Sequence, residues 1–116
     1  MIEDKKTIGL TANNREIVEL ILATNLFHDQ KDVAKFAMAF AINHNIAPGN
    51  VEGAGTVWNT GSLDEGSEIR NLILTLYPQT EAPYRMMEGL INAGLTAIGE
   101  AMRNGSDVLD LVIMAP

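Results

Sequence analysis

Cysteine is absent from this chain of 116 residues, which excludes disulfides, thiolate metal ligands and a cysteine nucleophile. Positive charge is scarce, because 8 lysines and arginines face 15 aspartates and glutamates and leave a net charge of −7. No apolar run approaches the roughly 20 residues that cross a bilayer, and no apolar leader follows the first residues, MIEDKK. We therefore expect a cytoplasmic protein with no membrane partner and no indiscriminate affinity for polyanions.

The length and composition predict one domain spanning residues 1–116. Hydrophobic residues make up 47% of the chain, which is enough to form a core without disulfide bridges or metals. The charges are unevenly distributed. Residues 1–46 carry five of the eight basic groups against six acids, whereas residues 47–116 carry three against nine. We expect any anion-binding surface to lie in the first half, whose basic residues are Lys5, Lys6, Arg15, Lys31 and Lys35.

The first half reads as a strand followed by two helices. Apolar Ile8 and Leu10 alternate with polar or small neighbours over residues 5–11, which is the period of a strand. Helical spacing then predicts a helix from about Asn14 to Leu26, capped by Asn13. Asp29 favours the start of a second helix, which Pro48-Gly49 would end.

The second half predicts a glycine-rich loop and then a helical hairpin. Residues 47–66 hold five of the ten glycines and the only tryptophan, which we expect to anchor a loop or a small extended excursion. One helix would begin near Ser62 and stop at Pro78, and a longer one would follow Thr80 with Pro83 in its first turn. The hairpin spans 62–104. The expected fold is mainly α, with a short N-terminal strand and about four helices.

Two further features of the second half concern packing. The last helix repeats a small residue every fourth position, a row that lets another helix approach closely, within the chain or between chains. The tail, residues 107–116, is apolar enough that we expect it to dock on the core or on a partner. The small residues of the row are Gly89, Ala93, Ala97 and Ala101.

The order strand, helix, turn, helix over residues 5–46, with the segment FHDQKDVAKFAMAFAINHNI, resembles the ribbon-helix-helix (MetJ/Arc-like) family of DNA-binding proteins. The resemblance implies that the strands of two chains pair into a ribbon that enters the major groove. It also implies that Ile8 and Leu10 form the dimer interface. The residues implied to contact DNA are Lys5, Lys6, Thr7, Gly9 and Thr11 of the ribbon, and His28, Gln30 and Lys31 at the start of the second helix, where backbone amides could hold a phosphate.

The layout of the whole chain also resembles, more faintly, the small E component of bacterial DNA phosphorothioation systems. That component likewise follows a ribbon-like front half with a helical back half. The resemblance implies contact with the DNA backbone through an oligomeric surface.

We find no pattern that predicts catalysis or a cofactor. His28 and His44 lack the spacing of a zinc site, and neither phosphate-binding glycine motif occurs in GNVEGAGTVWNTG. Close pairs of carboxylates are explained by helix caps and solvated faces.

Two functions remain open. The first is a non-enzymatic homodimer or larger homo-oligomer that binds DNA, as a transcriptional regulator or a DNA-modification accessory protein. The second is an oligomeric scaffold that binds a protein partner through the last helix and the apolar tail, without nucleic acid.

Overall fold

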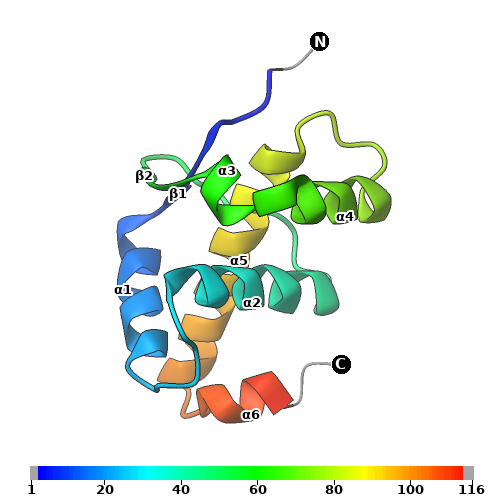
Figure 1. Ribbon diagram of the computed structural model, residues 1–116. Coiled ribbons are helices and arrows are strands. Elements are labelled where there is room, and N and C mark those ends of the chain that lie inside the picture. The colour runs from blue at the N-terminus through cyan, green and yellow to red at the C-terminus, as the bar shows by residue number, and fades with distance from the viewer. Residues whose placement is uncertain (1–2, 114–116) are drawn as a thin grey trace.

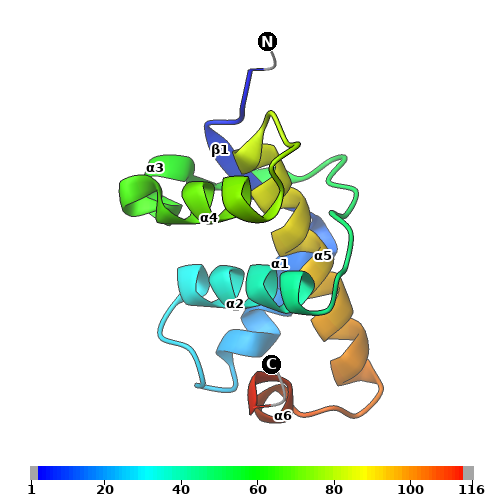
Figure 2. The ribbon, with the colours of Figure 1, turned by 90° about the vertical axis from the view of Figure 1, so that its right-hand side faces the viewer.

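The structure is a computed structural model that describes residues 3–113, and one long helix, α5 (Pro83–Arg103), runs through its middle (Figure 1). Helix α2 (Gln30–Asn43) packs across α5 more extensively than any other element does. Figures 1 and 2 both place α4 (Glu68–Leu76) alongside α2, and α6 (Val108–Ile113) near the C-terminal end of α5. The mainly helical class is confirmed, with six α-helices in the described chain where about four were expected.

A small antiparallel sheet joins the two halves of the chain. The expected N-terminal strand is β1 (Thr7–Leu10), and it pairs with β2 (Gly55–Asn59). Strand β2 lies inside the segment predicted to be a glycine-rich loop, so the extended alternative for that segment was the correct one. Trp58 on β2 is buried in the core, as expected of an anchor. A bulge between Ile8 and Gly9 shifts the register beyond that point.

Helix α1 (Ala12–Leu22) begins two residues earlier and ends four residues earlier than predicted. Its cap is Thr11, whose hydroxyl accepts a hydrogen bond from the Asn14 backbone nitrogen at 3.2 Å, and not Asn13. At the other end the Thr24 hydroxyl donates to the Ile21 carbonyl at 2.6 Å. This bond and the left-handed backbone of Asn25 turn the chain out of the helix.

Helix α2 starts as predicted, because the Asp29 carboxylate accepts from the Asp32 backbone nitrogen at 3.0 Å. It ends at Asn43 and not at Pro48-Gly49. Asn45 has a positive φ of 53°, and the Ile46 nitrogen donates back to the Ala41 carbonyl, which closes the helix several residues before the proline.

The helix predicted from Ser62 is divided into a short helix, α3 (Thr60–Leu63), a 3₁₀ turn (Glu65–Ser67) and α4. The break occurs at two consecutive residues with positive φ, Gly66 and Ser67. Ser62, where this helix was expected to begin, therefore lies within α3 and does not start α4. Buried Asp64 caps α4 instead, and its carboxylate accepts from the backbone nitrogens of Ile69 and Arg70 at 2.8 and 3.0 Å.

Helix α5 confirms the prediction, with Pro83 in its first turn, and its small residues are used for packing inside the chain. Gly89 lies against Pro48, and Ala93 lies against Gly49. Helix α5 is thus largely interior, with Thr96 and Glu100 among its exposed residues. The tail forms α6, which buries Val108 and leaves Leu109 and Val112 exposed, and residues 114–116 of the predicted tail lie outside the described residues.

No helix of the described chain has the length and apolar character needed to span a bilayer.

Candidate nucleic-acid interface

The two strands form a ribbon with an apolar inner face and a polar outer face. Ile8, Leu10 and Trp58 are buried on the inner side. On the other side Thr7 stands opposite Asn59, and Gly9 stands opposite Thr56. The hydroxyls of Thr7 and Thr56 approach to 3.5 Å across the strands. We call Thr7, Thr56 and Asn59 the ribbon outer face, which contains hydrogen-bonding groups but no charge, whereas Gly9 beside them is buried.

Of the two lysines at the start of the ribbon, only one is free. The Lys5 ammonium forms an ion pair at 3.1 Å with Glu88, whose side chain is 2% exposed. Because the Glu88 charge is buried, Lys5 is needed to offset its desolvation. Lys6 is exposed, and its ammonium forms no ion pair with any residue between 3 and 113.

Of the two acids that precede the lysine pair, Glu3 is exposed, whereas Asp4 is bound to α5. The Asp4 carboxylate accepts hydrogen bonds from the backbone nitrogens of Tyr84 at 2.8 Å and Arg85 at 3.1 Å. It therefore caps α5, where the helix dipole favours a negative charge. The same contact brings the exposed Arg85, a basic residue that the sequence did not point to, to the lysine end of the ribbon.

The second edge of β1 is closed by side chains of α5. The Gly9 nitrogen donates to Glu88 at 2.8 Å, and the Asn92 amide donates to the Gly9 carbonyl at 3.0 Å. The Thr11 nitrogen donates to the Asn92 side-chain oxygen at 3.2 Å. Two side chains one turn apart thus take the place of a neighbouring strand.

This arrangement changes the role of the residues that the resemblance placed at a dimer interface. Ile8 and Leu10 are 0% and 2% exposed in the core of the single chain. Strand β1 already has β2 on one edge and α5 on the other, so Gly9 and Thr11 offer no free backbone groups to a strand from a second copy. The ribbon is completed within one chain.

The predicted contacts at the start of α2 lie on a separate element. His28 and Gln30 are exposed, and the Gln30 amide donates to Glu19 at 3.1 Å. The helix start that was expected to hold a phosphate is capped by Asp29. Lys31 lines a groove between α2 and α3–α4 that also contains Glu65 and Glu68. The structure therefore brings Lys5, Lys6 and Thr7 together. His28, Gln30 and Lys31 are not part of the ribbon outer face.

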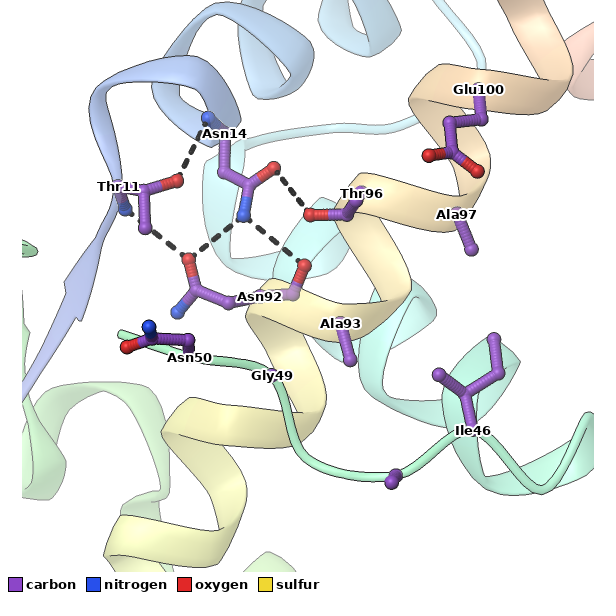
Figure 3. A pocket seen from close by; sticks show the side chains of 11 residues that line it. Thr11, Asn14, Ile46, Gly49, Asn50, Asn92, Ala93, Thr96, Ala97 and Glu100 are labelled. Carbon is purple, nitrogen blue, oxygen red and sulfur yellow. Dashed lines mark hydrogen bonds between the residues drawn. The ribbon is translucent and has the colours of Figure 1, made fainter. Parts of the chain in front are cut away.

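A buried polar network, which was not predicted from the sequence, joins α5 to α1 (Figure 3). The Asn14 amide donates to the side-chain oxygen of Asn92 at 2.9 Å and to its backbone carbonyl at 3.1 Å. The Thr96 hydroxyl donates to the Asn14 side-chain oxygen at 3.3 Å. Between residues 3 and 113, no buried side-chain nitrogen or oxygen lacks a partner. The available signal was the spacing of Glu88 and Asn92, which lie one turn apart beside the apolar stripe of this helix.

In the part of the chain that the structure describes, no cluster of three or more histidine, cysteine, aspartate or glutamate side chains could hold a metal ion. Comparisons of the chain with protein-family models, curated proteins and solved structures gave no match.

Proposed function

We propose that this protein is a non-enzymatic DNA-binding protein that presents its own two-stranded ribbon to the major groove. The observation that carries the proposal is the distribution of charge around the ribbon. The outer face has no acid, and Lys6 and Arg85 are exposed at one end of it. Of the nearby carboxylates, Asp4 is occupied by the α5 amides and Glu88 by Lys5, whereas Glu3 is exposed.

The shape and chemistry of the ribbon support this role. The major groove admits a two-stranded β-ribbon, and asparagine and threonine side chains can contact base edges there. Thr56 and Asn59 are exposed on the outer face. The net charge of −7 opposes binding, so we expect one chain to bind weakly and affinity to fall steeply with salt. Two or more copies acting together would compensate through multivalency, which is why we propose a homo-oligomer.

The experiment compares two exposed lysines, one at the ribbon and one on α2 in the groove that contains Glu65 and Glu68. Lys6→Gln removes a charge at the ribbon, and Lys35→Gln removes the same charge from α2. Binding to a fluorescent duplex is measured by anisotropy between low and moderate salt. We expect Lys6→Gln to reduce the slope of log affinity against log salt by about 1, because one phosphate contact is lost per bound chain, and Lys35→Gln to leave the slope unchanged.

Two results would contradict the proposal. One is an absence of duplex binding at low salt, and the other is an equal effect of the two substitutions. The scaffold hypothesis gains support only if DNA binding is absent while the protein self-associates. In that case the surface to investigate is α6, since Leu109 and Val112 are exposed and α5 is largely interior.

A further inference from the structure

A pocket of about 380 Å³ lies where α1, the loop after α2 and α5 meet (Figure 3). Thr11 and Asn14 of α1 line one side, and Asn92 to Glu100 of α5 line the base. The loop contributes Ile46, Ala47, Gly49 and Asn50. Its volume is near the lower end of the range for small-molecule sites, about 300–1,000 Å³, which limits a ligand to a small size.

The walls of this pocket are held in place before any ligand binds. Asn14 is tied to Asn92 by two hydrogen bonds, which fixes α1 on α5. The Gly49 nitrogen donates to the Gly89 carbonyl at 2.9 Å, which fixes the loop on α5. A pocket whose walls are already ordered binds a ligand without the entropic cost of closing around it.

The polar groups at one end of the pocket that are free to bind a ligand favour a positively charged ligand. Glu100 is the only ionisable side chain that lines it, and its carboxylate has no hydrogen bond or ion pair with residues 3–113. The guanidinium of Arg103, one turn further along α5, donates a hydrogen bond to the side-chain oxygen of Asn13 at 3.3 Å and forms no ion pair with Glu100. The Thr96 hydroxyl donates its proton to Asn14, so its remaining lone pairs can only accept. An acceptor-rich end of a pocket calls for a cationic donor.

The opposite end has a different character. The Asn50 side-chain oxygen accepts from the Glu52 nitrogen at 2.9 Å, which leaves its amide hydrogens as donors. Figure 3 shows Asn50 and Glu100 at opposite ends of the pocket, with Ala93 and Ala97 between them. The middle of the pocket is therefore apolar. The Glu100 end offers hydrogen-bond acceptors, and the Asn50 end offers donors.

We propose that this pocket binds a small organic amine. Its ammonium group contacts the Glu100 carboxylate and the Thr96 hydroxyl oxygen, its short hydrocarbon body lies on Ala93 and Ala97, and a hydroxyl or similar acceptor at its far end takes a hydrogen bond from Asn50. A carboxylate ligand of the same size would be repelled by Glu100, and an uncharged alcohol would gain no ion pair.

The test uses isothermal titration calorimetry on the whole chain with three probes of similar length, namely 4-amino-1-butanol, 1-butanol and butyrate. We expect one site per chain for the amine, and no measurable binding of the other two. Glu100→Gln should weaken amine binding about two- to fivefold, because Glu100 is exposed and an exposed ion pair contributes up to about 1 kcal/mol. The matched control is Glu16→Gln, which removes the same charge from an exposed position on α1 outside the pocket lining.

A second variant, Ala97→Leu, fills the apolar middle and should abolish binding while the circular dichroism spectrum stays unchanged. If that variant does not fold, the comparison of Glu100→Gln with Glu16→Gln still decides the question. The proposal is overturned if the amine does not bind, if the alcohol binds equally well, or if Glu100→Gln and Glu16→Gln have the same effect.

Discussion

At the scale of single residues, Gly94 shows how closely the two main helices approach. A Cβ atom built on Gly94 would overlap the carbonyl oxygen of Ala37 on α2. That neighbour is helix backbone, which cannot move aside as a flexible side chain could. The close contact between α2 and α5 therefore depends on the absence of one methyl group.

We predict that Gly94→Ala lowers the free energy of unfolding by about 2–3 kcal/mol, because the two helices must separate to admit the methyl group. Gly61→Ala is the control, because a Cβ at Gly61 meets no atom within 4 Å. Alanine there should be neutral or slightly stabilising. Urea unfolding of both variants gives the measurement, and equal stabilities would contradict the structure at this contact.

At the scale of elements, β1 is stabilised by a helix as much as by a strand. Asn92 satisfies the Gly9 carbonyl and the Thr11 nitrogen, two backbone groups that would otherwise face the interior unpaired. Buried backbone groups without partners are costly, so this side chain is a structural requirement for the strand to end against α5.

We predict that Asn92→Leu, which keeps the volume and removes the hydrogen bonds, destabilises the protein by about 3 kcal/mol. Amide exchange at Thr11 should accelerate more than exchange within α2. Thr96→Val is the matched control on the same helix, since Thr96 is exposed and makes one hydrogen bond to the network. Its cost should stay within about 1 kcal/mol. Unchanged exchange at Thr11 in Asn92→Leu would mean that Asn92 does not hold the strand.

At the scale of the whole molecule, Tyr84 links α5 to the α3–α4 region. Its hydroxyl donates to the Asp64 carboxylate at 3.0 Å, and Asp64 also caps α4. Burial of the phenol raises the Tyr84 pKa above its usual value, and the adjacent negative charge of Asp64 adds to the effect. The folded protein thus holds the phenol proton at a pH where the unfolded chain has lost it.

The sign of the pH dependence follows from this proton. A raised pKa in the folded state gives a stabilisation that is complete below the unfolded tyrosine pKa of about 10 and is lost as pH rises through the folded value. We predict that the stability advantage of the wild type over Tyr84→Phe shrinks as pH increases above about 10. Urea unfolding of the two proteins across this range measures it, and a constant difference would contradict the prediction.

The sequence predicted the elements whose signals are local. Strand β1, the Asp29 cap of α2 and the position of Pro83 in the first turn of α5 were all expected, because alternation, a capping side chain and a proline act within a few residues. The prediction failed at α4, where Gly66 and Ser67 take positive φ and Asp64 becomes the cap. The segment SLDEGSE contains two serines and an aspartate, residue types that can each cap a helix, and it is Asp64 that bonds to α4 and to Tyr84.

For the candidate site, the sequence indicated Lys6 and Thr7 but not their surroundings. Whether Lys5 is free or paired, and whether Asp4 opposes a phosphate or caps a helix, depends on α5, whose residues lie about eighty positions away along the chain. A local sequence pattern covers only a few residues, so it does not show contacts between residues this far apart along the chain.

The amino-acid sequence by itself indicated where β1, α1, α2 and α5 lie, that β1 has an apolar face, and that most of the positive charge lies in the first half. Only the tertiary structure decided what lies against each edge of β1, because backbone hydrogen bonds accept any partner with the right geometry, whether a strand from another copy, a strand of the same chain or two side chains on a helix. Here β2 and α5 fill both edges, and the ribbon belongs to one chain.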